Sequence, residues 1–213
     1  MGFYNATSDA SNFVISFRPD LEQDFGAFAK GYALAASNLA EKLLEKSHFP
    51  DYEAYPVVFL YRHAFELYLK GFYYRAKRIS FFKKSQSVEH QGKIDHSLVP
   101  FAETFQKICA ALFSHDNELL QLADKIIRFA NEFEEIDLDS FSYRYPMGKK
   151  GNKITAHHQI VNLFSFHQSM QELLDELEII DFGLDMTEDQ AKEIYEIFLE
   201  NRNKIDSEYY EAG

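Results

Sequence analysis

The stretch that decides the fold is VVFLYRHAFELYLKGFYY, residues 57–74. At 3.6 residues per turn it is apolar on nearly every side, which is typical of a helix surrounded by other helices. Among its few polar residues, Arg62, Glu66 and Lys70 are spaced four apart and therefore share one narrow stripe. The stretch predicts a central helix that carries a single line of charge.

Apolar residues spaced three and four apart continue on both sides of this stretch, and alternating patterns are scarce. We expect helices over residues 20–46, 55–78, 97–113, 116–135 and 157–180, and a last one from Thr187, with Gln190 as its capping partner. The first helix should turn inward a stripe from Phe25 and Phe28 to Leu43, and Gly26, Gly31 and its alanines should let a neighbouring helix approach closely. Because most connections are short, consecutive helices should lie antiparallel.

Residues 137–155 interrupt the helical pattern. Phe141 to Pro146 alternates, and Gly148 to Asn152 is turn material, which predicts a short β-hairpin-like excursion near 141–155. The predicted fold class is therefore all-α, an antiparallel helical bundle of about five or six helices with this excursion.

The bulk composition favours one domain over residues 1–213, with an N-terminal arm at 1–19 and a C-terminal helix and tail at 187–213. Apolar residues make up 46% of the 213 residues, which is ample for a core, and nothing in the middle has the composition of a linker. We expect no membrane association, because no apolar run approaches spanning length. Cys109, the single cysteine, is expected in the core, and it fits a reducing, cytoplasmic location.

Charge is distributed unevenly along the chain. The net charge of -12 repels nucleic acid and anionic membranes, yet residues 62–93 hold eight Lys or Arg and two acids, and residues 171–213 hold fourteen acids and three bases. Aromatic residues alternate with the basic ones in the first segment, as in sites for single-stranded nucleic acid. If this segment converges with Arg144 and the lysines of the excursion, we expect an RNA or nucleotide site; if not, each is a solvated loop.

The charged stripe of the central helix has two interpretations. Burying unpaired charges is costly, so the stripe either faces water, with weak surface ion pairs, or faces a polar groove. In the second case Arg62 and Lys70 would bind a phosphate or another anion, and Glu66 would hold Arg62 in place.

Metal and cofactor chemistry finds little support in the sequence. The eight histidines form no Cys/His cluster and no His-Glu-x-x-His motif, and Glu45-x-x-His48 matches only half of a di-iron bundle signature. A glycine-rich phosphate loop is absent. We therefore expect no metal, no cofactor and no catalytic residue.

The segment from Arg62 and His63 through Glu66 to Lys70 resembles the corresponding helix of bacterial HEPN-like proteins (higher eukaryotes and prokaryotes nucleotide-binding domain). The segments around His96 and from Phe141 to Pro146 also look like segments of that group, and the resemblance spans about residues 55–177. It implies a helical bundle, often a dimer, in toxin–antitoxin, phage-defence or RNA-processing systems. Active members are metal-independent ribonucleases with an arginine, four to six residues and a histidine, a spacing that no arginine of this chain has.

Three functional hypotheses follow from these observations. The first is a non-catalytic HEPN-like module that binds a nucleotide, RNA or a cognate protein, in a defence or toxin–antitoxin type of system and as a homodimer. Its predicted site is formed by Arg62, His63, Glu66, Lys70, His96 and Arg144. The second is a metal-independent ribonuclease. The third is an interaction protein whose acidic last helix is an amphipathic docking surface.

Overall fold

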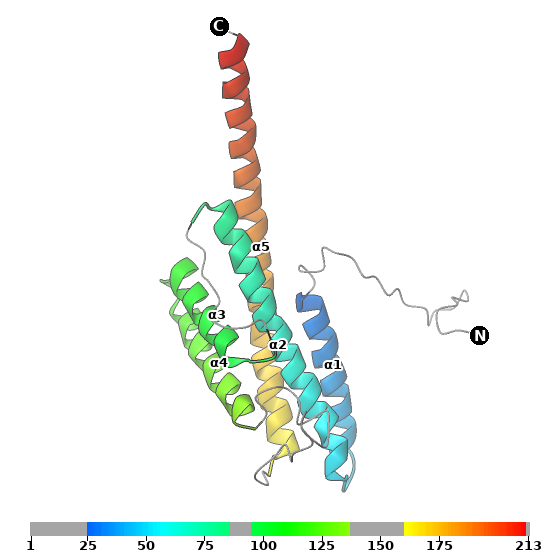
Figure 1. Cartoon of the computed structure of the whole chain (residues 1–213). Helices are drawn as coiled ribbons and strands as arrows, with labels where there is room; N and C mark the ends of the chain where they lie inside the picture. The colour runs from blue at the N-terminus through cyan, green and yellow to red at the C-terminus, as the bar shows by residue number, and fades with distance from the viewer. Residues whose placement is uncertain (1–24, 86–94, 137–159, 212–213) are drawn as a thin grey trace, which may run out of the picture.

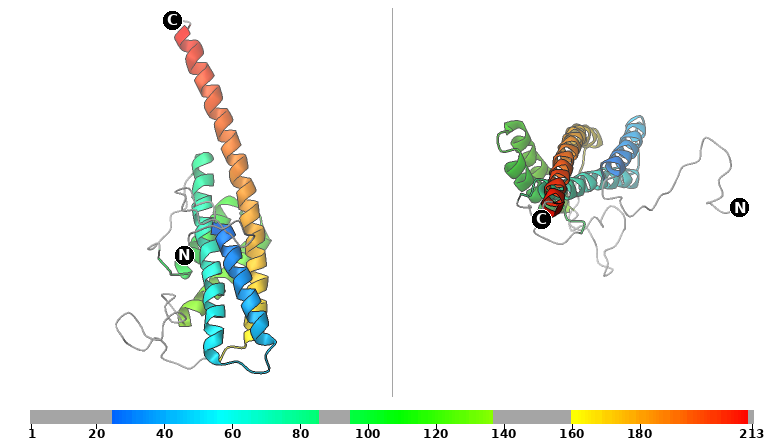
Figure 2. Two further views of the ribbon diagram at one scale, coloured as in Figure 1. Left: turned by 90° about the vertical axis from the view of Figure 1, so that its right-hand side faces the viewer. Right: turned by 90° about the horizontal axis from the view of Figure 1, so that it is seen from above.

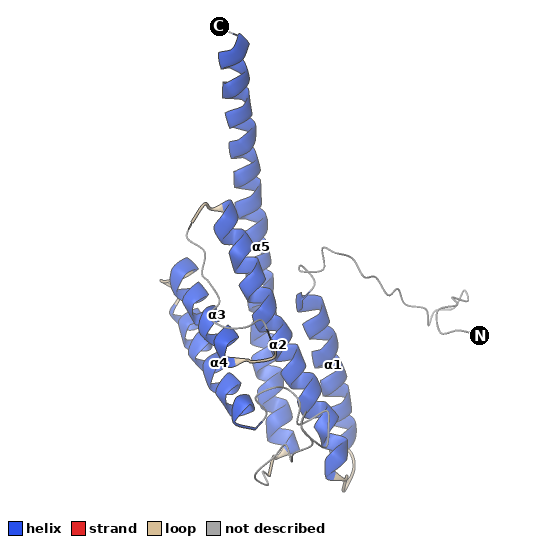
Figure 3. Cartoon of the chain, in the orientation of Figure 1, coloured by secondary structure: helices blue, strands red, loops and turns tan. Residues whose placement is uncertain are grey.

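The computed structural model describes residues 25–85, 95–136 and 160–211, and for residues 205–211 it describes the helix but not the side chains. The described part is a bundle of five helices, α1 (Phe25–Leu44), α2 (Asp51–Phe82), α3 (Val99–Leu112), α4 (Asn117–Ile136) and α5 (Leu163–Glu211) (Figure 1). No strand occurs in these residues (Figure 3). The predicted excursion at 141–155 lies outside the described residues, as does the arm at 1–19.

Helix α2 is central, as its apolar sequence predicts. It contacts α1, α3 and α5, and seen from above α1 lies on one side of the molecule and the α3–α4 pair on the other (Figure 2). Large side chains such as Phe65, Phe72 and Ile79 are completely buried. The helix is longer than predicted, because it begins after Pro50 rather than at Tyr55. It ends where Lys84 adopts a left-handed backbone with a φ of 50°.

Helix α1 packs into the bundle through small residues together with part of the predicted stripe, because Leu43 is buried and Phe25 stacks on Tyr74 of α2. Ala29, Ala36 and Ala40 are fully buried, whereas Phe28 is 52% exposed. Small side chains let the helices approach closely, which displaces the large ones to the edge of the contact. The expected close approach at Gly26 is confirmed, because a Cβ there would overlap the Asp181 carboxylate of α5.

Helix directions depart from the predicted antiparallel order at one connection. The contacts between α2 and α3 advance together along both helices, from Arg62 with His96 to Phe72 with Phe105, so these consecutive helices run parallel. The pairs α1–α2, α3–α4 and α4–α5 are antiparallel, as expected (Figure 1).

Helix α5 is one helix of 49 residues, where the sequence analysis expects two. Thr187 does not cap a new helix, because its hydroxyl donates to the carbonyl of Gly183 one turn earlier, at 2.8 Å. Helix α5 runs parallel to α2, passes its C-terminal end and continues alone beyond the bundle (Figures 1 and 2). The histidines expected to open the fifth helix, residues 157 and 158, lie outside the described residues.

Candidate functional site

The charged stripe of α2 converges on one carboxylate. Lys70 Nζ lies 2.7 Å from Glu66 Oε1, and His96 Nδ1 lies 3.0 Å from the same oxygen. Arg62 Nη1 donates to Glu66 Oε2 at 3.3 Å, and its Nη2 donates to the His96 carbonyl at 2.8 Å. His63 Nδ1 lies 3.9 Å from Glu66 Oε2. These five residues form what we call the Glu66 cluster.

Burial divides the Glu66 cluster into an inner and an outer part. The side chains of Arg62 and Glu66 are 0% and 1% exposed, whereas that of His96 is 52% exposed. The exposed fractions of the Lys70 and His63 side chains lie between these two values. The stripe is thus not a solvated surface; its inner end faces the segment that precedes α3, and the protein itself supplies its polar partners.

Hydrogen bonding keeps Glu66 ionised. Burial alone raises the pKa of this carboxyl group, but the nearby His63, the hydrogen bonds from Lys70 and His96 and the charge of Lys70 outweigh burial and lower the pKa to about 2. The carboxylate therefore stays charged at every physiological pH, and it holds Arg62 and Lys70 in fixed positions.

Five of the six residues predicted for the site meet in the Glu66 cluster. The sixth, Arg144, lies outside the described residues, as do Lys149, Lys150 and Lys153 of the excursion. The convergence of this segment with the basic segment of residues 62–93 therefore stays a prediction.

Two of the arginines in the basic segment of residues 62–93 are paired within the bundle. Arg75 contacts Asp181, Asp185 and Glu188 of α5, with 3.4 Å to Asp181 Oδ1 and 3.6 Å to Glu188 Oε2. Arg78 binds both oxygens of Glu188, at 2.5 and 3.0 Å. The basic segment and the acidic C-terminal segment thus hold α2 and α5 together.

A buried polar link between α2 and α5 was missed by sequence reasoning. The Tyr61 hydroxyl lies 2.5 Å from His167 Nδ1, and burial raises the pKa of Tyr61 to about 12, so the hydroxyl keeps its proton. Tyr61 stands beside the charged stripe in the sequence, but no spacing pattern connects it with His167. Only the parallel packing of α2 and α5 brings the two residues together.

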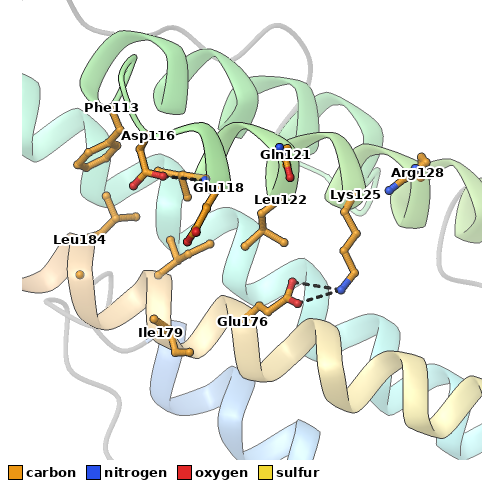
Figure 4. A pocket seen from close by; sticks show the side chains of 13 residues that line it. Phe113, Asp116, Glu118, Gln121, Leu122, Lys125, Arg128, Glu176, Ile179 and Leu184 are labelled. Atoms are coloured by element: carbon orange, nitrogen blue, oxygen red, sulfur yellow. Dashed lines mark hydrogen bonds and ion pairs between the residues drawn. The ribbon is translucent and has the colours of Figure 1, made fainter.

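A hollow lies between α4 and α5 (Figure 4). Its volume is about 690 Å³, and Leu119 and Leu122 of α4 face Ile179 and Gly183 of α5 across it. Lys125 Nζ spans its rim to both oxygens of Glu176, at 3.1 Å each (Figure 4). The hollow has an apolar floor and a charged rim, and no set of acid, base and nucleophile converges in it.

The free half of α5 exposes large apolar side chains. The spacing in the last predicted helix predicts an inward stripe of Ala191, Ile194, Tyr195, Phe198, Leu199 and Ile205. Ala191 is buried and Tyr195 half-buried, Ile194, Phe198 and Leu199 are exposed, and the side chain of Ile205 lies outside the described ones. Tyr195 contacts Phe81 and Phe82 at the end of α2, whereas Ile194 is 63% exposed. Ile194 is exposed because no other described helix continues alongside α5 where α2 ends (Figure 1).

The described residues contain no candidate metal site, no membrane-spanning helix and no reactive cysteine. These residues contain no group of three or more His, Cys, Asp or Glu placed to hold a metal, and none of the helices searched there is both long and apolar enough to cross a bilayer. Cys109 is buried, as predicted, and burial raises the pKa of its thiol to about 12, which leaves it unreactive.

Comparison with known proteins returns no relative of this chain: no family model, no curated protein and no solved structure matches it.

Proposed function

We propose that this chain is a non-catalytic, HEPN-like helical module that works by binding a protein partner through the exposed face of α5. The observation that carries the proposal is the exposure of Ile194 and Ile197, at 63% and 52%, on α5 where it passes the end of α2. A run of exposed apolar side chains on a regular element is typical of an interaction surface.

The environment of Arg62 supports the non-catalytic part of the proposal. A guanidinium that stabilises a phosphorane must reach the substrate, but Arg62 is 0% exposed and donates to Glu66 and to the His96 carbonyl. Incubation of RNA with the wild type, Arg62→Ala and His63→Ala is the check. Equal residual cleavage by all three would mark a contaminant, and cleavage lost in both variants would establish the ribonuclease alternative.

Affinity purification tests the binding part. The tagged full chain is compared with the double variant Ile194→Asp/Ile197→Asp and with Lys192→Asp, a control at an exposed position on another side of α5. We expect a partner that the wild type and the control retain and that the double variant loses at least tenfold, measured by quantitative mass spectrometry. Recovery of the same proteins at equal levels by all three chains would refute this proposal.

A second candidate is binding of RNA or a nucleotide at the outer part of the Glu66 cluster. It is favoured by the convergence of Lys70, His63 and His96 on one carboxylate at a partly exposed edge. Filter binding of single-stranded RNA across a salt series tests it, with Lys70→Ala beside the exposed control Lys107→Ala. Binding that weakens with salt and falls only in Lys70→Ala would support it; no salt-dependent binding by the wild type would remove it.

A further inference from the structure

An uncharged line runs along the exposed side of α5. Its large members are Ile179, Met186, Ile194 and Ile197, between 52% and 72% exposed, and Gly183 and Gln190 lie between them. The steps of four, three, four, four and three residues average the helical repeat of 3.6, so the line stays on one side of the helix.

The charges of α5 keep clear of this line. Between residues 179 and 197 the sequence has six acids and one lysine, and none falls on it. Exposed acids instead follow one edge of the line, at Asp189, Glu193 and Glu200, spaced four and seven residues apart and therefore nearly in register along the helix. The opposite edge carries Phe198, which is 47% exposed and has the Lys84 ammonium 3.6 Å from the centre of its ring.

The lower end of the line joins the hollow between α4 and α5. Ile179 and Gly183 belong to both, and Leu119 and Leu122 form the facing wall. The line therefore begins in the hollow, where α4 faces α5 (Figure 4), and continues along α5 through exposed residues.

We propose that this surface binds an amphipathic helix of another protein, with an apolar face along the line and Lys or Arg side chains along the acidic edge. The inference rests on the proposed function and specifies the partner. Helices commonly bind to partner surfaces through apolar residues at i, i+3, i+4 and i+7, and the edge formed by Asp189, Glu193 and Glu200 selects the charge of the ligand.

A second copy of α5 fits this surface poorly. In an antiparallel pair of helices each edge faces the same edge of its partner, so the acids of one copy would lie against the acids of the other. A parallel pair would bring two bundles side by side, each in a chain of net charge -12. Charge complementarity therefore favours a basic partner helix.

The test uses the full chain and two synthetic helical peptides of about three heptads. Both have a leucine face; one carries lysines along one edge, and the other carries glutamates in the same positions. Fluorescence anisotropy should show that the lysine-edged peptide binds at least tenfold more tightly. Ile194→Asp should weaken that binding at least tenfold, with the helical circular dichroism signal unchanged because the residue is exposed.

Paired charge reversals separate the acidic edge from the net charge. Glu193→Lys/Glu200→Lys should reverse the preference between the peptides, whereas Glu103→Lys/Glu135→Lys, the same change at exposed positions on α3 and α4, should leave it intact. Equal weakening by both reversals, or no binding of the lysine-edged peptide, would overturn the inference.

Two outcomes distinguish failure of the inference from failure of the proposed function. Self-association of the wild type in sedimentation equilibrium that Ile194→Asp abolishes would make a second copy the occupant; it would overturn the basic partner helix and leave the interaction module standing. Absence of peptide binding, of self-association and of any partner lost from Ile194→Asp/Ile197→Asp would overturn both.

Discussion

Arg62 and Glu66 form a buried ion pair in α2, in the middle of the bundle. Two buried ions are costly to desolvate, and their attraction offsets that cost only when further hydrogen bonds satisfy the remaining donors and acceptors. Here Lys70 and His96 bind the second carboxylate oxygen and the His96 carbonyl accepts from Arg62. The Glu66 cluster therefore links the middle of α2 to the start of α3.

Removing Arg62 should destabilise the fold. Arg62→Met leaves Glu66 buried with fewer partners, and the free energy of unfolding should fall by about 3–5 kcal/mol. Urea denaturation followed by circular dichroism measures it, with Lys107→Met as an exposed control expected to change little. A loss below about 1 kcal/mol would mean that the pair behaves as a surface ion pair.

Acid should weaken the fold through Glu66. Its pKa is about 2 in the folded chain against an ordinary 4.5, so the ionised form contributes stability above pH 4.5, and that contribution is lost as the pH falls from 4.5 toward 2. The shift corresponds to about 3 kcal/mol. Glu66→Gln should be less stable than the wild type at neutral pH, and its free energy of unfolding should fall less between about pH 5 and about pH 3. An equal fall in both proteins would contradict a lowered pKa at Glu66.

Residue spacing and the family resemblance predicted different members of the Glu66 cluster. The interval of four residues predicted that Arg62, Glu66 and Lys70 share a stripe, and Glu66 does bind both neighbours. Spacing could not predict His96, whose contact depends on the direction of α3; the family resemblance pointed to it. Nor could spacing indicate that Arg62 is fully buried, because that follows from the packing of the segment before α3.

Among the elements, α5 departs most from its sequence pattern. Gly183 and the pair of Thr187 with Gln190 have the signature of one helix ending and another beginning. The helix continues because Arg75 of α2 binds acids on both sides of Gly183, at Asp181 and Asp185. Tertiary ion pairs thus fix the backbone where local propensity favours a break.

Thr187→Ala distinguishes a continuous α5 from two capped helices. The Thr187 hydroxyl bonds back to the Gly183 carbonyl, and alanine has the higher helix propensity, so stability should stay the same or rise by a few tenths of a kcal/mol. Thermal denaturation provides the measurement. Loss of an N-cap would instead cost about 1 kcal/mol, and a loss of that size would contradict the continuous helix.

Two glycines test the close contact of α1 with α2. A Cβ at Gly71 would lie 2.9 Å from the Cβ of Phe25, whereas a Cβ at Gly31 would meet no atom within 4 Å. Gly71→Ala should lower the free energy of unfolding by about 1–3 kcal/mol, and Gly31→Ala should raise it by up to about 1 kcal/mol. Chemical denaturation of both variants is the measurement, and equal effects would contradict the packing.

At the scale of the whole molecule, ion pairs between α2 and α5 account for part of the uneven charge distribution. The excess of bases in residues 62–93 predicted a nucleic-acid site on condition that it converged with Arg144 and the excursion, but Arg75 and Arg78 form ion pairs with acids of α5. A charge count along the chain cannot show which segments lie side by side. The all-helical bundle was predictable from apolar periodicity, whereas the parallel packing of α2 with α3 and α5 was not.

Helix α5 therefore has two parts with different partners. Its lower half is held by α2 through ion pairs and by the core, and its upper half presents apolar side chains beyond the bundle (Figure 1). An exposed apolar line beside an acidic edge is unfavourable in isolation, and the partner helix that we propose would cover it.

Hydrogen–deuterium exchange of the full chain, with and without the lysine-edged peptide, tests this central claim most directly. Binding along α5 predicts slower exchange in residues 179–200 and in the facing part of α4 around Leu119 and Leu122, with no change around the Glu66 cluster. Protection confined to residues 62–70 and 95–98, or no protection anywhere, would contradict the account.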